Sequence, residues 1–418
     1  MDKETITSLL LEQNKPQQAL EQTVPREITG QVKRTAEQNI SIISGIRRSG
    51  KSTLLRQLQR QEQRPQLYVN FDDDRFIEFT VQDFQKLLEA SIETIGEPDV
   101  FFFDEIQNIK GWERFVRRLH DNGKTIYVTG SNATMLSKEL GTHLTGRHIT
   151  TPLYPFSFKE FLTFKNKRFD NDKPTPTERA NLKKLFNEYA KTGGIPKYVR
   201  YAEEEYLRTL YKDILYRDII TRFNVNNEKA LKETVYHCMS NVGKEVSYNS
   251  LKKLTGLSSA TTIKEYLEYV ESTYLLFQLN RFNHSLKKQI YANKKIYAVD
   301  QAISRIIGFR PTDDMGRILE NIVFIQLKRE NKEIYFHKQK QECDFLIREG
   351  YRITQAIQVC HRLDENNRKR ETQGLAEAMG THKLKEGILL TYDDNEKTIT
   401  EQKKTIHVMP VWKWLLKQ

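Results

Sequence analysis

The chain has 418 residues, more than one hydrophobic core supports, so we expect two to four domains. Its 38% hydrophobic and 29% charged residues are typical of an ordered globular protein and exclude an intrinsically disordered one. The longest apolar runs, such as residues 100–103, have only the length of a strand, which excludes a membrane-spanning segment and predicts no membrane partner.

The cysteines and the start of the chain predict a cytoplasmic protein. Cys238, Cys343 and Cys360 are widely spaced and form no C-x-x-C pair, so neither a disulfide framework nor a zinc site is expected. The first residues are polar and include no apolar targeting segment. The net charge of +12 suits a polyanion such as double-stranded DNA, but an ordinary solvated surface can have the same charge.

Residues 1–38 read as a lead-in to the first domain, and the decisive motif follows them. A short apolar strand at residues 40–43 opens into Gly-Ile-Arg-Arg-Ser-Gly-Lys-Ser at residues 45–52, and a helical pattern comes next. This is the spacing G-x-x-x-x-G-K-[ST] of a phosphate-binding loop between a strand and a helix. The residues expected to bind ATP are Gly45, Arg48, Ser49, Gly50, Lys51, Ser52 and Thr53.

Two residues of this loop have predicted chemical roles. Lys51 is expected to reach the β- and γ-phosphates of ATP and to be catalytic, and the Ser52 hydroxyl is expected to bind Mg²⁺.

The second motif is the apolar run 100–103 followed by Asp104 and Glu105. Four bulky apolar residues fit a buried parallel strand, and such strands bind ligands at their carboxyl ends. We expect Asp104 to hold Mg²⁺ and Glu105 to orient and deprotonate the attacking water.

Two further catalytic candidates follow. The strand-like run 125–128 leads to Ser131 and Asn132, either of which is placed to contact the γ-phosphate or its water, unless they cap the next helix. Arg147 lies in a glycine-punctuated loop and is expected either to stabilise the transition state in a neighbouring subunit or to form a structural ion pair.

After residue 160 the pattern becomes mainly helical and then mixed. We expect a helical lid at 161–235, which includes Tyr-Arg-Asp at 216–218, and a winged-helix-like unit at 236–290. The strand-like runs 274–279 and 289–291 are assigned to the wing. Residues 241–295 contain nine Lys or Arg and four Glu, so this unit is predicted to contact either DNA or a protein. The candidates for phosphate and groove contacts are Lys264, Lys287, Lys288, Thr261 and Thr262.

The last segment, 291–418, alternates strands and helices and predicts a small α/β domain with a mixed sheet. The predicted domains are therefore 1–160, 161–235, 236–290 and 291–418.

Together these motifs resemble the prokaryotic AAA-type ATPases that carry a C-terminal domain of unknown function with a nuclease-like fold. The segments that carry the resemblance are 45–52, 103–107, 129–132, 144–147, 155–161, 193–196, 216–218, 295–300, Glu320, 342–347 and 410–415. The resemblance implies an α/β fold with a P-loop ATPase domain, a winged helix and a restriction-endonuclease-like tail. It does not imply a biological role.

One departure from the nuclease pattern bears on chemistry. A nuclease of that fold needs an Asp and a Glu on a divalent metal and a Lys two residues after the Glu. Asp344 and Glu320 are present, but the strand that should read Glu-x-Lys reads Gln358-Val359-Cys360. We therefore expect the tail to bind DNA or a protein without cutting.

The leading hypothesis is an Mg²⁺-dependent ATPase that forms a homo-oligomer and whose nucleotide state moves C-terminal DNA- or protein-binding domains. A nucleotide-gated DNA-binding protein with little turnover is the alternative, and a metal-dependent nuclease is the third.

Overall fold

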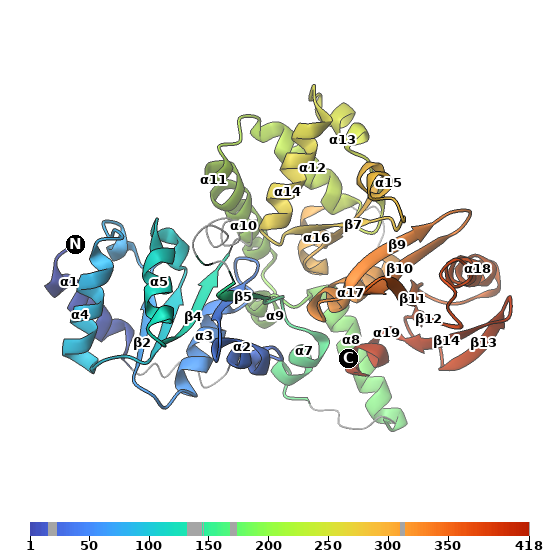
Figure 1. The fold of residues 1–418 in the computed structure, drawn as a ribbon. Coiled ribbons are helices and arrows are strands. Elements are labelled where there is room, and N and C mark those ends of the chain that lie inside the picture. Colours follow the sequence, from blue (N-terminus) through green and yellow to red (C-terminus); the bar gives the residue numbers. More distant parts are fainter. Residues whose placement is uncertain (16–22, 132–143, 145, 168–173, 310–313, 418) are drawn as a thin grey trace. The chain divides into compact units, whose positions relative to one another are not determined.

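The computed structural model describes residues 1–15, 23–131, 144, 146–167, 174–309 and 314–417 (Figure 1). They form two compact units, Met1–Leu153 and Tyr154–Gln418. The first unit ends before the predicted boundary at residue 160, and the second spans the residue ranges of the other three predicted domains. Among the described residues, no helix is both long enough and apolar enough to cross a membrane.

A five-stranded parallel sheet forms the centre of the first unit, with the strand order β2-β3-β4-β1-β5. Its strands are β1 (Ile40–Ser44), β2 (Gln66–Asn70), β3 (Val100–Asp104), β4 (Thr125–Gly130) and β5 (His148–Pro152). Because all five run in one direction, their carboxyl ends meet at one edge of the sheet. The predicted strands at 40–43, 100–103 and 125–128 are therefore neighbours.

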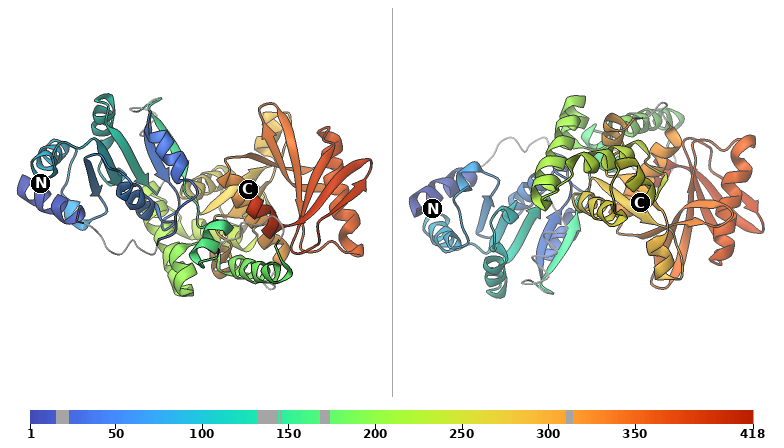
Figure 2. Two further views of the ribbon diagram at one scale, coloured as in Figure 1. Left: turned by 90° about the horizontal axis from the view of Figure 1, so that it is seen from below. Right: turned by 90° about the horizontal axis from the view of Figure 1, so that it is seen from above.

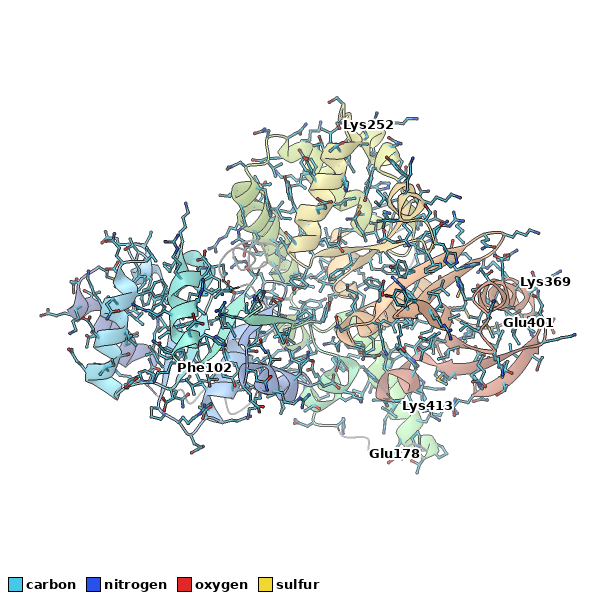
Figure 3. The ribbon with its side chains drawn as sticks, in the orientation of Figure 1. Phe102, Glu178, Lys252, Lys369, Glu401 and Lys413 are labelled. Atoms are coloured by element: carbon cyan, nitrogen blue, oxygen red, sulfur yellow. The ribbon has the colours of Figure 1, made fainter. Side chains whose placement is uncertain are left out.

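Helices cover both faces of this sheet (Figures 1 and 2). They are α1 (Lys3–Gln13), α2 (Thr29–Ala36), α3 (Lys51–Arg60), α4 (Asp83–Ile95) and α5 (Trp112–Asp121), with short 3-10 turns at Asp74–Phe76 and Ile106–Asn108. Successive residues of β3 point to opposite faces, so Phe101 and Phe103 join one apolar core and Phe102 joins the other. Figure 3 labels Phe102 within the sheet. Burial on both faces explains the uninterrupted apolar run.

The second unit begins with helices. They are α7 (Phe158–Phe164), α8 (Pro176–Thr192), α9 (Pro196–Tyr201), α10 (Glu204–Asp213), a π-helical stretch at Ile214–Ile220 and α11 (Thr221–Phe223). Capping boxes start α7 at Ser157 and α8 at Thr175.

A three-stranded antiparallel sheet with the order β6-β8-β7 follows. Its segments are α12 (Glu228–Ser240), β6 (Glu245–Val246), α13 (Tyr248–Thr255), α14 (Ala260–Ser272), β7 (Leu276–Asn280), α15 (Leu286–Tyr291) and β8 (Lys294–Ala298). The predicted strand at 289–291 is wrong, because these residues end the helix α15. Ser285 caps this helix by accepting a hydrogen bond from the Lys288 amide, and strand pairing resumes only at Lys294.

The remaining chain forms a mixed six-stranded sheet with the order β13-β14-β12-β11-β10-β9. Its segments are α16 (Gln301–Ile307), α17 (Met315–Arg329), β9 (Glu333–Lys338), β10 (Glu342–Glu349), β11 (Arg352–Val359), α18 (Glu365–Thr381), β12 (Glu386–Thr391), β13 (Lys397–Glu401), β14 (Lys404–Pro410) and α19 (Val411–Lys417). The strands β9 to β11 are antiparallel, and β11, β12 and β14 are parallel.

Asp300 ties the helical part of the second unit to the start of α16. Its carboxylate accepts hydrogen bonds from the amides of Gly194 at 2.6 Å and Ala302 at 2.8 Å. A Cβ at Gly193, where φ is +65°, would lie 2.2 Å from the same carboxylate, and one at Gly194 would lie 2.3 Å from the Phe156 carbonyl oxygen. The Gly-Gly pair is therefore required by close packing.

Burial raises the pKa of Asp300 to about 6, even though backbone amides donate to its carboxylate. The folded state therefore holds a proton at this site that the unfolded chain has released above its ordinary pKa of 3.8. This contribution to stability is complete below pH 3.8 and is lost as the pH rises through about 6.

We predict that the free energy of unfolding contains a component that falls by about 3 kcal/mol between pH 4 and pH 7 and that Asp300→Asn removes it. Urea unfolding of the full chain across this range measures it, as the difference between the two pH profiles. Parallel profiles for the wild type and the variant would contradict the assignment.

Candidate functional site

The loop between β1 and α3 has the backbone conformation of a phosphate cradle. Gly45, Arg48 and Gly50 have φ values of 148°, 134° and 100°. A Cβ at Gly45 would lie 2.3 Å from the Leu153 carbonyl oxygen, so only glycine fits there. Arg26 supports the loop from outside by donating to the Ser49 carbonyl oxygen at 2.7 Å. The loop ends at the amino terminus of α3, where helix amides point outward and favour an anion.

Lys51 lies in the loop and is buried. Its ammonium donates to the carbonyl oxygens of Gly45 at 3.0 Å and Ile46 at 3.3 Å and lies 3.6 Å from Glu105 Oε1. The two sequence motifs thus meet at the carboxyl edge of the sheet. Of the other predicted loop residues, Arg48 and Ser52 are exposed, Ser49 is buried and Thr53 is half-buried.

Asp104 ends β3 and is 2% exposed. Tyr68 donates to its Oδ2 at 2.9 Å and Thr129 donates to its Oδ1, and the Ser52 hydroxyl is near enough to lower the pKa of this carboxylate. Burial raises the pKa of Asp104, and the neighbouring Glu105 raises it further, while these hydroxyl donors lower it. A cation would therefore be favoured beside this carboxylate.

Glu105 is held in a turn just after the strand. Its φ of 51° and ψ of 39° are left-handed, and its amide donates to the Thr129 hydroxyl at 3.0 Å. Gln107 donates to its Oε2, while Oε1 faces Lys51. The Thr129 hydroxyl therefore positions both acidic residues of the motif.

Two domain family models match parts of this chain, and two known proteins are similar to most of it. The AAA domain family model matches residues 37–162, and a domain of unknown function, DUF8612, matches residues 183–313. An uncharacterized protein of Methanocaldococcus jannaschii is 36% identical over 397 residues, which cover 90% of this chain and 88% of that protein. An uncharacterized protein of Haemophilus influenzae is 34% identical over 394 residues, which cover 90% of this chain and 94% of that protein. The chain belongs to the same family as these two proteins and contains an AAA domain.

Among solved structures, the Thermotoga maritima protein titled RuvB Holliday junction branch migration motor is 14% identical, with a TM-score of 0.31. The match covers 66% of this chain and 93% of that one. Domain III of the Thermotoga maritima replication initiation protein DnaA is 16% identical, with a TM-score of 0.27. This match covers 41% of this chain and 86% of the DnaA domain. Scores at this level carry no argument about function.

The sequence did not single out Tyr68, Thr129, Gln107 and Arg26, which contact the residues of the candidate site. Tyr68 read as an ordinary strand residue, but the Arg56 guanidinium lies 3.1 Å from the centre of its ring and its hydroxyl holds Asp104. The position of Thr129 at the end of a strand beside β3 could have marked it. The sequence instead predicts that Ser131 or Asn132 contacts the γ-phosphate or its water. Ser131 is buried just after β4, and Asn132 lies outside the described residues.

Arg147 lies at the other end of the sheet from the phosphate loop. It immediately precedes β5, and its carbonyl oxygen accepts from the Ile40 amide at the start of β1. The length of β1, roughly 16 Å, separates that edge from the loop. Its guanidinium Nε lies 3.0 Å from Asp121 Oδ1. Within its own chain Arg147 therefore forms an ion pair and does not reach Lys51.

We predict that Thr129→Val lowers the free energy of unfolding by about 2 kcal/mol, because Asp104 loses a buried donor and the Glu105 amide loses its acceptor. Denaturant unfolding measures the loss. Thr125→Val, at the half-buried start of the same strand, is the matched control and is expected to change stability by less than about 0.5 kcal/mol. Equal effects of the two substitutions would refute the role of Thr129.

Proposed function

We propose that the AAA domain binds ATP and hydrolyses it with Mg²⁺. The observation that carries this proposal is the meeting of Lys51 and Ser52 of the loop with Asp104 and Glu105 of β3 at one edge of the sheet. A strand, a glycine-shaped loop and a helix amino terminus surround the position of the phosphates.

The side chains have distinct proposed roles. The loop amides and Lys51 bind the β- and γ-phosphates, and Lys51 exchanges its bonds to the Gly45 and Ile46 carbonyls for phosphate oxygens. The Ser52 hydroxyl and the Asp104 carboxylate offer the hard oxygen ligands that suit Mg²⁺, which when bound neutralises charge on the phosphates. Glu105 orients and deprotonates water after Lys51 has turned from it to the phosphates.

Two proposed roles concern assembly and the γ-phosphate. Asn132 or Ser131 would contact the γ-phosphate or its water. Arg147 would act only in a neighbouring subunit of a homo-oligomer, because it lies at the far edge of its own sheet. A size-fractionated ATPase assay tests this role, since activity would then follow the oligomer.

We predict that Lys51→Ala abolishes ATP binding and hydrolysis, because the phosphates lose their buried cation. Glu105→Gln is expected to keep ATP binding and to lower kcat by about 100-fold or more, because the water loses its base. Phosphate release and a nucleotide-binding titration measure the two effects. Glu89→Gln, on the exposed face of α4, is the matched control and is expected to behave like the wild type.

The result that would overturn this proposal is wild-type hydrolysis that survives Lys51→Ala unchanged.

We further propose that the segment from α12 to β8 is a winged helix that binds double-stranded DNA under the control of the nucleotide. Its order of helix, strand, two helices and two strands, with the short helix α15 between the last two strands, supports this proposal. Lys264, Lys287 and Lys288 are exposed, although Lys264 pairs with Glu268 at 3.6 Å. Lys252 on α13 is labelled in Figure 3. Lys294 and Lys295 are buried, so the charge available to DNA is smaller than the sequence count.

We predict that the double variant Lys287→Ala/Lys288→Ala weakens duplex DNA binding and reduces the slope of log K against log salt by about 2, because two phosphate contacts are lost. Binding isotherms at two salt concentrations, with and without ATP, measure the slope and the nucleotide effect. The control, Lys383→Ala/Lys385→Ala, removes two exposed lysines from another part of the chain. Absence of DNA binding at low salt would rule out this function and leave a protein partner.

A further inference from the structure

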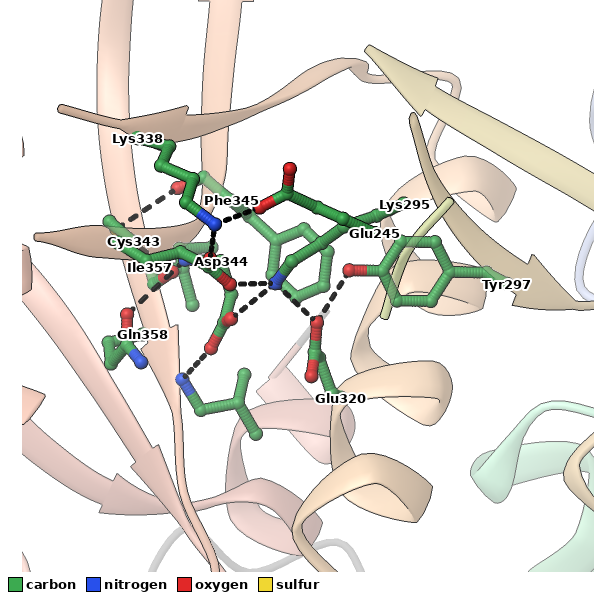
Figure 4. Close-up of polar contacts among 12 residues, drawn as sticks. Glu245, Lys295, Tyr297, Glu320, Lys338, Cys343, Asp344, Phe345, Ile357 and Gln358 are labelled. Carbon is green, nitrogen blue, oxygen red and sulfur yellow. Dashed lines mark hydrogen bonds and ion pairs between the residues drawn. The ribbon is translucent and has the colours of Figure 1, made fainter. Parts of the chain in front are cut away.

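Three carboxylates of the second unit converge on one buried ammonium group (Figure 4). Lys295, on β8, is 2% exposed. Its Nζ lies 3.0 Å from Glu320 Oε1, 2.9 Å from Asp344 Oδ1 and 2.7 Å from Glu342 Oε1. The ammonium group donates hydrogen bonds to Glu320 and Asp344 and forms an ion pair with Glu342.

The carboxylates are held in place by further contacts. Tyr297 donates to Glu320 Oε1 at 2.6 Å, and the Val359 amide donates to Asp344 Oδ2 at 3.0 Å. Gln358 does not replace a carboxylate here, because its Oε1 accepts from the Asp344 amide and its Nε2 donates to Glu371. The acidic oxygens therefore have fixed positions around Lys295.

The carboxylates around Lys295 depend on its positive charge. Burial and the charge of Asp344 raise the pKa of Glu320, so the carboxylates repel one another. Burial alone would lower the pKa of Lys295, but Asp344 and Glu320 outweigh it and raise that pKa well above its usual value. Lys338 pairs with Glu342 only from the side, at 3.4 Å, and also with Glu245. Removal of Lys295 would leave the buried carboxyl groups of Glu320 and Asp344 without this counter-charge.

The same carboxylates line a cavity of about 800 Å³, together with Lys340 and Gln358, so small ions can reach them. Clustered carboxylate oxygens are the ligands that divalent cations such as Mg²⁺ and Mn²⁺ prefer. The distances of 2.7 to 3.0 Å fit an ammonium group, whereas Mg²⁺ would require about 2.1 Å. Among the described residues, no group of His, Cys, Asp or Glu side chains is arranged to hold a metal ion.

We propose that Lys295 is the resident cation of this pocket and occupies the position that a divalent metal ion would take between Glu320, Glu342 and Asp344. The pocket therefore carries its own positive charge from the neighbouring strand β8 and excludes a metal. Without a metal to polarise a phosphate or activate water, the pocket lacks the means for metal-dependent hydrolysis. This inference is independent of ATP hydrolysis by the AAA domain.

The test is a Mn²⁺ titration without nucleotide, by calorimetry and electron paramagnetic resonance, on the full chain. The proteins are the wild type, Asp344→Asn, Lys295→Ala, Lys295→Ala/Asp344→Asn and the matched control Lys340→Ala. We expect Lys295→Ala to gain one saturable site that is about tenfold or more tighter than any in the wild type. The double variant, Lys340→Ala and the wild type are expected to lack it.

Thermal unfolding gives a second readout. Lys295→Ala is expected to have a lowered Tm in metal-free buffer, and Mn²⁺ is expected to raise that Tm. If the variant is unfolded without metal, Mn²⁺ is expected to restore a cooperative thermal transition. Mn²⁺ that fails to raise this Tm, or raises it equally in the double variant, would overturn the proposal. A wild-type Mn²⁺ site that Asp344→Asn removes would also overturn it, because the lysine would then not exclude the metal.

Discussion

The carboxylate of Asp104 is the interaction on which the first unit depends. It is buried at the end of β3, accepts hydrogen bonds from Tyr68 of β2 and Thr129 of β4, and lies close to the Ser52 hydroxyl at the start of α3. A buried charge without partners costs several kcal/mol, so these four elements are held in one arrangement. The same contacts that satisfy the carboxylate bring the phosphate loop, the acidic strand end and Glu105 to one edge of the sheet.

Sequence alone predicted the parts whose signal is local. The loop at residues 45–52 could be predicted because its backbone geometry requires glycines at fixed spacing. The strand β3 could be predicted because a strand buried on both faces is apolar throughout. The side chains that bond to Asp104 could not be predicted, since they depend on which strands are neighbours in the sheet. Residues 289–291 have strand-like composition, yet Ser285 caps a short helix that includes them.

Burial of charge accounts for the other differences between the sequence and the structure. Lys295 counted toward a basic surface in the sequence, but it is buried against three carboxylates. Asp300 is a buried helix cap that holds the Gly-Gly turn, which its place in the sequence does not reveal. For Arg147 the sequence left open a role in a neighbouring subunit or a structural ion pair, and within its own chain the structure shows an ion pair with Asp121. Net charge and spacing do not reveal the partner of a buried ion.

The central claim is that the loop and Asp104 together bind ATP with Mg²⁺. Isothermal titration calorimetry of the wild type with ATP, in the presence of Mg²⁺ and in the presence of EDTA, tests it most directly. The account predicts one saturable site that binds more tightly with Mg²⁺. No saturable binding under either condition would contradict it.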